Sequence, residues 1–287
     1  MRRLPRHGWF VTCAVWATVV SIGHVAVAEP EVMRPVFRAA LEGGDSAWSA
    51  RAETIDERLA APDRIESAIA AYRSALEAEP DSMEARWKLL RALHYAIDFT
   101  RSSSEAQDAR VVEAIAVARA GREALEARAG SEADRARLHF WSAIAWGTRA
   151  QRVGLLTIVR EGVATRMHDD AEQSLVLDPS VDRGGALRLL SRLHGTLPRV
   201  PFVSGWVDRD RALELAERGQ TLDPDHPGNR LILALTLLEQ APERTPEARA
   251  LLESVVDANP RPDFVVEDLA IREQARERLA ELDAEAR

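Results

Sequence analysis

The sequence is poor in cysteine, lysine and aromatic residues. Cys13 is the only cysteine among 287 residues, Lys88 is the only lysine, and aromatic residues make up 5% of the chain. A disulfide framework needs paired cysteines, and thiolate zinc sites or cysteine nucleophiles need cysteines in the folded part. Because Cys13 lies in an N-terminal apolar run, these chemistries are excluded for the chain that follows that run.

Alternating β-branched runs of strand length are also absent from the sequence. Ala, Leu, Glu and Arg are abundant instead, and all four are strong helix formers. With 46% hydrophobic and 29% charged residues, the composition is that of a globular protein. We therefore expect an all-α fold.

The net charge of −8 argues against nucleic acid as a partner, because a phosphate backbone attracts basic surfaces. Local basic patches remain compatible with this charge.

The N-terminus has the pattern of an export signal. Arg2, Arg3 and Arg6 precede an apolar run from residue 9 to 22, and Ala26-Val27-Ala28 offers small residues at the positions a signal peptidase reads. We predict a signal peptide over residues 1–28, cleavage after Ala28, and a periplasmic or secreted protein. The alternative is an uncleaved anchor, but the apolar run is short of the ~20 residues that span a bilayer. Since Cys13 lies inside the run, lipidation is not expected, and no stable membrane anchor remains after cleavage.

Turn prolines mark a repeat in the rest of the chain. Pro80, Pro179, Pro224 and Pro260 each follow a helical stretch, and before Pro80 and Pro224 small residues stand twelve and five positions earlier. Before Pro80 these residues are Ala68 and Ala75. Before Pro260 only the first of these positions is small. Small side chains at this spacing let two helices approach closely, and the proline then ends the helix. Around Pro179 the pattern is looser.

The spacing of the prolines predicts which helices have lost their turn signals. The 99 residues between Pro80 and Pro179 must hold two helix pairs, with a second helix at 111–127 and a first helix at 133–151. Residues 29–43 are expected as a loosely ordered lead-in and residues 44–287 as the repeat domain. The stretch 263–287 is expected as a C-terminal capping helix. The predicted fold is a right-handed superhelical array of antiparallel helix pairs, partly degenerate.

This arrangement resembles the tetratricopeptide repeat superfamily. The segments Trp48–Arg51, Trp87–Tyr95 and Gly184–Pro198 are similar to the periplasmic tetratricopeptide component associated with TRAP transporters, and more distantly to the regulators of microtubule dynamics. The resemblance implies a helical periplasmic protein that binds a solute-binding protein and shelters a small hydrophobic ligand in a pore. Transporter-associated members are commonly lipoproteins, whereas this chain has no suitable cysteine.

Catalytic and metal-binding patterns are missing from the sequence. There is no Gly-x-Ser-x-Gly elbow and no P-loop, and no two histidines of the repeat region stand three or four residues apart. The cluster His168-Asp169-Asp170 is interpreted as part of a solvated helix face. We therefore predict no catalytic residues, no metal, no cofactor and no enzyme.

The first helix of each pair is expected to line the concave side. The candidate binding residues include Glu84, Trp87, Arg91, His94 and Tyr95, with Arg188 and Arg192 at the corresponding later positions. They form an aromatic and cationic lining that suits an extended peptide or an anionic group.

Three tryptophans need a separate interpretation. Trp141 and Trp146 diverge by about 140° on a helix, so one is expected in the core and the other near the groove. Both are kept as candidate binding residues. Trp206 lies in a proline-rich loop that is expected to fold back over the array.

Three functions compete on this basis. The first is an exported scaffold that binds a protein partner or ligand in its long concave groove, without catalysis. The second is a TRAP-type transporter accessory that holds a small hydrophobic ligand. The third is an envelope enzyme, which no residue spacing in the sequence supports.

Overall fold

The structure is a computed structural model that describes residues 30–127, 130–201 and 203–285. The expected signal peptide, residues 1–28, and its cleavage site lie outside the described residues. Among the helices that are described, none combines the length and the apolar character needed to cross a membrane.

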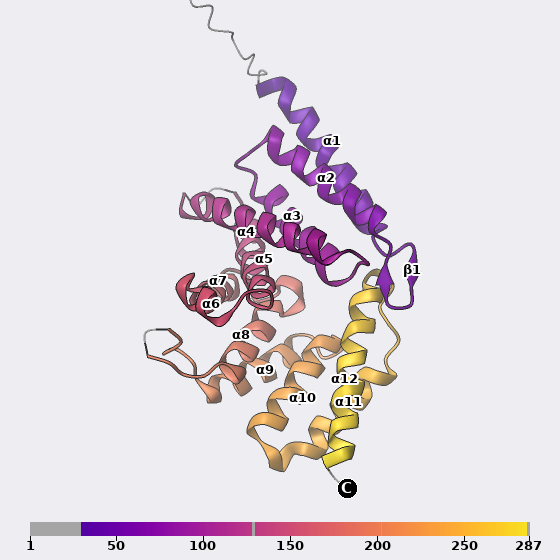
Figure 1. The fold of residues 1–287 in the computed structure, drawn as a ribbon, viewed down its shortest axis with the longest axis vertical. Helices are drawn as coiled ribbons and strands as arrows, with labels where there is room; N and C mark the ends of the chain where they lie inside the picture. Colours follow the sequence, from indigo (N-terminus) through magenta and orange to yellow (C-terminus); the bar gives the residue numbers. More distant parts are fainter. Residues whose placement is uncertain (1–29, 128–129, 202, 286–287) are drawn as a thin grey trace, which may run out of the picture.

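Over this range the chain forms five antiparallel helix pairs and a last single helix (Figure 1). The pairs are α1 (Pro30–Ser49) with α2 (Pro62–Ala78), α3 (Met83–Asp98) with α4 (Ser104–Glu126), α5 (Glu132–Ala150) with α7 (Val163–Leu177), α8 (Gly185–Thr196) with α9 (Arg209–Leu222), and α10 (Pro227–Gln240) with α11 (Thr245–Asp257). The last helix is α12 (Val265–Glu285). The predicted all-α array with a C-terminal helix is confirmed.

Smaller elements connect the helices. Strands β1 (Ile55–Asp56) and β2 (Leu59–Ala60) pair antiparallel between α1 and α2, with Ile55 opposite Ala60. The short helix α6 (Leu155–Arg160) precedes α7. The 3-10 turns η1 (Val181–Arg183), η2 (Pro242–Arg244) and η3 (Pro262–Phe264) precede α8, α11 and α12.

The turn prolines act as the sequence predicts. Helices α2, α7, α9 and α11 end just before Pro80, Pro179, Pro224 and Pro260. Ser82, beside Pro80, caps α3 by accepting the N–H of Ala85 at 3.2 Å. In the stretch without turn prolines, α5 coincides closely with the helix predicted at 133–151, whereas α4 begins at Ser104, seven residues before the helix predicted at 111–127.

The prediction of a loose lead-in over residues 29–43 is wrong for the part that the structure describes, because residues 30–49 form helix α1. Leu41 of α1 is buried against the first core. A Cβ on Gly44 would lie 2.4 Å from Cε1 of Tyr72, so only a glycine lets α1 approach α2 this closely. The first pair therefore begins before residue 44.

The C-terminal helix returns to the start of the array. In Figure 1, α12 runs beside β1, at the connection between α1 and α2. Val266 of α12 is fully buried in the N-terminal core, whereas Ala275 and Leu282 belong to the C-terminal core. The helix caps the last pair as predicted, but it also joins the two ends. The concave side is therefore a recess closed by α12, and the long open groove expected from the repeats is not formed.

Candidate binding site

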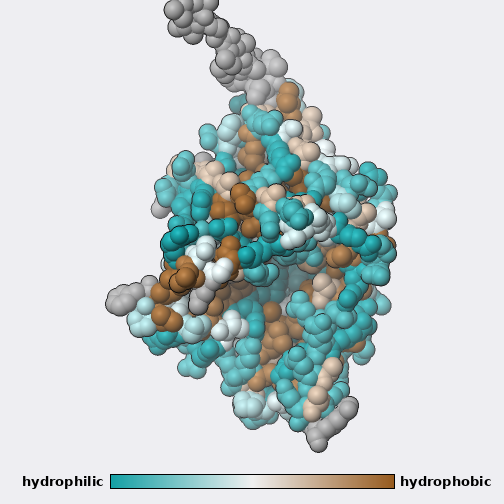
Figure 2. Space-filling model, viewed as in Figure 1, coloured by the Kyte–Doolittle hydropathy of each residue, from teal (hydrophilic) through white to brown (hydrophobic). Residues whose placement is uncertain are grey.

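A cavity of about 390 Å³ lies on the concave side, where α1, α3, α5 and α12 face one another. Figure 2 shows this side of the molecule hollowed near its centre. The wall combines aromatic and positively charged side chains, and it is lined by Trp48, Trp87, Arg91, His94, Tyr95, Phe99, Arg137, Trp141, Ser180, Val181, Asp182, Arg183, Arg188, His226, Arg261, Phe264, Glu267 and Ile271.

Helix α3 supplies four of these side chains. Trp87, Arg91, His94 and Tyr95 are four, three and one residues apart, which places them on one face of a helix. Ser82 caps the start of α3, and most of the residues of this helix are buried. The structure thus brings together four residues chosen from the sequence.

Arg91 lies between two tryptophan rings. Its guanidinium carbon is 3.9 Å from the ring centroid of Trp48 and 4.9 Å from that of Trp87. Arg137 of α5 approaches the same Trp87 ring at 5.5 Å. The Nε1 of Trp87 donates to Asp134 at 3.0 Å. Trp87 therefore packs between helices and at the same time fixes two arginines at the cavity wall.

Positive charge exceeds negative charge at this wall. Three of the five lining arginines have a carboxylate partner, in the pairs Arg183–Asp223, Arg188–Asp182 and Arg261–Asp268. Arg91 and Arg137 have none within 4.0 Å in the described part of the chain. Glu267 is paired with Arg51. Two guanidinium groups at the wall therefore lack a direct ion-pair partner in the described part of the chain.

Arg188 reaches the cavity but is already engaged. It donates to Asp182 Oδ2 at 2.5 Å, to the Asp182 carbonyl at 2.9 Å and to the Arg183 carbonyl at 3.1 Å. Asp182 and Arg183 have φ of 49° and 53°, a left-handed backbone conformation that residues other than glycine rarely adopt. Arg188 therefore holds the strained η1 turn in place at the cavity wall.

The charge at the wall also acts on His226. Burial, together with the charges of Arg188, Arg261 and Arg183, lowers the pKa of His226 to about 2. Its Nδ1 accepts the N–H of Gly228 at 3.1 Å, so His226 caps α10 as a neutral ring. Burial likewise lowers the pKa of Arg91, since the charged form loses water there.

Three candidate residues from the sequence lie elsewhere. Glu84 pairs with Lys88 at 2.6 Å, and Arg192 pairs with Glu239 at 3.0 Å. Trp146 is 2% exposed in the core, whereas Trp141 lines the cavity. Glu84 is too near the start of α3, and Trp146 faces the core because it lies five residues from Trp141. All three are removed from the site.

The sequence analysis missed the other twelve lining residues, among them Trp48, Arg137, Phe264 and Glu267. For Arg137 a signal existed, because it lies one turn before Trp141 on the same helix face. The contributions of Phe264 and Glu267 depend on α12 reaching the first pair, which no local pattern reveals.

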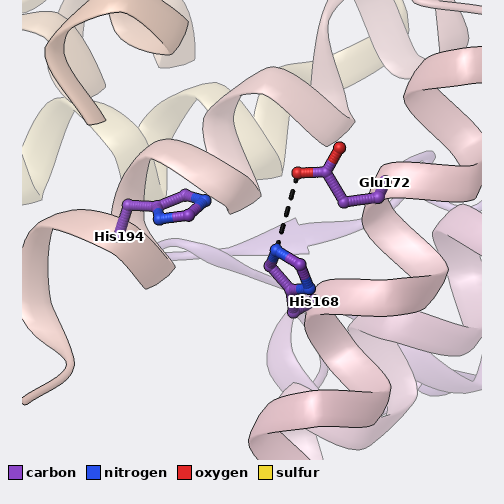
Figure 3. A group of neighbouring side chains, drawn as sticks. All are labelled: His168, Glu172 and His194. Atoms are coloured by element: carbon purple, nitrogen blue, oxygen red, sulfur yellow. Dashed lines mark ion pairs between the residues drawn. The ribbon is translucent and has the colours of Figure 1, made fainter. Parts of the chain in front are cut away.

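A second polar cluster lies outside the cavity (Figure 3). His168 and Glu172 of α7 lie toward His194 of α8, with donor atoms within 4.8 Å of one another. His194 Nδ1 accepts the N–H of Asp208 at 3.0 Å, so the neutral ring carries its proton on Nε2 and offers no lone pair there. Arg211 also lies 2.6 Å from Glu172. This hydrogen bonding favours packing over metal binding.

The same cluster corrects one interpretation and confirms another. His168 and Asp170 are largely shielded from solvent, so only Asp169 of the three faces water as expected. Trp206 stacks on His168 with ring centroids 4.0 Å apart. The loop between α8 and α9 therefore folds back over the array, as predicted.

Larger clefts exist, but they lack aromatic walls. One of about 540 Å³ lies between α2, α4 and the start of α3, and one of about 450 Å³ lies between α8, α9 and α10. Neither contains an aromatic residue. Aromatic side chains and arginines carry most binding energy in recognition sites, so the central cavity is the stronger candidate.

No family model matches this chain, and no curated protein matches its sequence. Among solved structures, the chain is similar to an assembly chaperone of RpL4 (Acl4), with 18% identity, a TM-score of 0.41, and coverage of 90% of this chain and 92% of that one. It is also similar to yeast Tom70, with 14% identity, a TM-score of 0.19, and coverage of 93% and 68%. Likenesses of this size carry neither fold nor function to the chain.

Proposed function

We propose that this chain is a non-catalytic interaction protein that binds a partner protein on its concave side, over the central cavity. One observation supports this proposal. Helices α1, α3 and α5 and the turn η3 bring Trp48, Trp87, Arg91, Trp141 and Phe264 to one recess. Tryptophan and arginine are the residues that most often dominate binding energy at protein interfaces.

Affinity capture with matched variants tests this proposal. The wild-type protein, Trp141→Ala at the cavity and Arg192→Gln outside it serve as baits for an envelope extract. We expect wild type and Arg192→Gln to enrich the same protein, and Trp141→Ala to lose it, since a large contact is removed. Equal enrichment by all three baits, or by none, contradicts a partner at the cavity.

A second function is favoured by the size of the cavity. We propose as the alternative an accessory protein of a TRAP-type transporter that works with a solute-binding protein and holds a small hydrophobic ligand. A volume of about 390 Å³ lies within the usual range of small-molecule sites. A neighbouring pocket of about 370 Å³ is mainly apolar and includes Ile144, Met167 and Leu193. Native mass spectrometry should show a retained lipid-like mass; a clean apo mass counts against this function.

Export remains a proposal that rests on residues 1–28 of the sequence. We propose that the protein is periplasmic or secreted. Intact mass measurement after cell fractionation should give a mature chain that begins at Glu29. A full-length chain in the membrane fraction supports the retained anchor instead, and a full-length chain in the cytoplasm contradicts export.

A further inference from the structure

Two buried hydrogen-bond donors at the cavity lack acceptors. The Nε–H of Arg91 and the hydroxyl of Tyr95 have no hydrogen-bond partner in the described part of the chain. Both side chains line the cavity. An unpaired buried donor is costly, so most such groups in proteins are satisfied by protein, water or ligand. Both atoms call for the same complement, an acceptor placed in the cavity.

The charges indicate that this acceptor is negative. Arg91 and Arg137 line the cavity, and no carboxylate of the described ranges lies within 4.0 Å of either guanidinium, although the more distant Asp45 attracts Arg91. Three other lining side chains of the described part also have a buried polar atom without a hydrogen-bond partner: Nδ1 of His94, Nη1 of Arg261 and Oε2 of Glu267, whose carboxylate Arg51 already holds. Because Arg51 pairs with Glu267, this carboxylate does not neutralise the two arginines.

Another part of the wall is apolar and aromatic. Trp48, Trp141, Phe264 and Ile271 surround the space beside the two arginines. A hydrated inorganic ion would leave these surfaces unfilled, whereas an apolar body would bury them. The volume of about 390 Å³ suits a small molecule and leaves little room for an extended peptide.

We propose that the cavity binds a small organic anion, a carboxylate attached to an aromatic or aliphatic body. The carboxylate accepts hydrogen bonds from Arg91 and Tyr95 and is neutralised by Arg137, and the body packs among the tryptophans. This inference rests on the proposed role of the cavity as a binding site, and it adds the chemistry of the ligand.

Calorimetric titration with one acid and its amide tests the charge requirement. The probes are 4-phenylbutyrate and 4-phenylbutyramide, which share the apolar body. We expect the acid to bind at least about tenfold more tightly, because charge-assisted hydrogen bonds to the arginines are lost with the amide. Equal affinities, or no binding of the acid up to its solubility limit, overturn the proposal.

Variants locate the anion. Arg137→Gln and Arg91→Gln should each weaken the acid about tenfold and leave the amide unchanged. Tyr95→Phe should weaken it roughly threefold to tenfold. Arg192→Gln, outside the cavity, is the matched control and should bind as wild type does. If circular dichroism shows that Arg91→Gln does not fold, the test uses the variant of the partly exposed Arg137 alone. An unchanged affinity of Arg137→Gln for the acid overturns the proposal.

A peptide probe tests whether the cavity prefers a small molecule or the C-terminus of a partner protein. A decapeptide that ends in a phenylalanine with a free carboxylate should bind more weakly than 4-phenylbutyrate, because the cavity has no room for its chain. Tighter binding of this peptide overturns the small-molecule assignment. Partner capture is an independent readout: capture that depends on Trp141 without any binding of the acid leaves the proposed function standing and removes this inference.

Discussion

Arg51 and Glu267 form an ion pair although they are 216 positions apart in the chain. The Nη2 of Arg51 lies 2.8 Å from Oε1 of Glu267, and Arg51 also donates to the carbonyls of Trp48, at 3.3 Å, and Asp263. Arg51 is only 4% exposed. The contact between the first helix pair and the last helix therefore includes a buried, multiply bonded guanidinium.

Replacing Arg51 should weaken the contact between α12 and the first helix pair. Arg51→Gln leaves Glu267 without its partner and should reduce the free energy of unfolding by ~2–3 kcal/mol, measured by urea denaturation. Small-angle X-ray scattering should show a larger radius of gyration if α12 separates from α1.

The control for this variant is the neighbouring exposed pair, Arg58 and Glu273, at 2.9 Å. Arg58→Gln should change stability by less than ~1 kcal/mol, because exposed ion pairs are screened by solvent. Similar effects of Arg51→Gln and Arg58→Gln would show that the buried pair has no special part in closure.

Adjacent glycines of α1 should respond in opposite directions. At Gly44 a new Cβ would meet Tyr72 at 2.4 Å, and Gly44→Ala should cost ~1–3 kcal/mol because the aromatic ring must shift. At Gly43 nothing lies within 4 Å, and Gly43→Ala should stabilise the protein by up to ~1 kcal/mol through helix propensity. Thermal denaturation of both variants measures the difference. Equal shifts would contradict the close packing of α1 on α2.

Two buried histidines should make the protein sensitive to mild acid. Burial lowers the pKa of His194 to about 4 and that of His226 to about 2, both from the ordinary 6.5. The unfolded chain therefore binds protons that the folded chain does not. The contribution of the two neutral histidines to the free energy of unfolding is fully present above pH 6.5 and is lost as the pH falls toward 4. In this range each histidine should add ~1.4 kcal/mol per pH unit to the slope of the free energy of unfolding against pH.

Urea denaturation at several pH values measures this slope. His226→Asn keeps a side chain that can cap α10 but cannot titrate, so the slope between pH 6.5 and 4 should fall by about one proton. A slope equal to that of wild type would mean that His226 is protonated at its ordinary pKa in the folded protein.

The loop before α9 should depend on Trp206. Trp206→Ala removes the ring stacked on His168, so trypsin should cut faster at Arg199 in that loop. Trp206→Phe keeps an aromatic ring there and serves as the control. If both variants are cut at the wild-type rate, Trp206 does not hold the loop.

The sequence predicts what local spacing determines. Small residues at fixed offsets before Pro80 and Pro224 identify the second helices of two pairs. The spacing within α3 predicts four residues of the cavity. Both predictions depend on helix geometry alone. The contact between Arg51 and Glu267 depends on the summed rotation of five pairs, to which each packing contact adds a small angle. No single segment encodes that sum.

The same limit explains the errors within the pairs. Helix α1 was missed because its packing depends on Gly44 meeting Tyr72, a contact between helices and not a pattern within one. Trp146 was kept as a candidate because a tryptophan at a wall and one in a core look alike until the neighbouring helix is placed.

The burial of Val266 in the first core has a consequence for how the chain acquires its fold. Repeat arrays usually gain structure stepwise, because each unit contacts only its neighbours. Here the apolar surface of the first two pairs is completed by a residue near the C-terminus. A nascent chain therefore leaves that surface uncovered until residue 266 has been synthesised, and N-terminal fragments that end before residue 265 should be prone to aggregate.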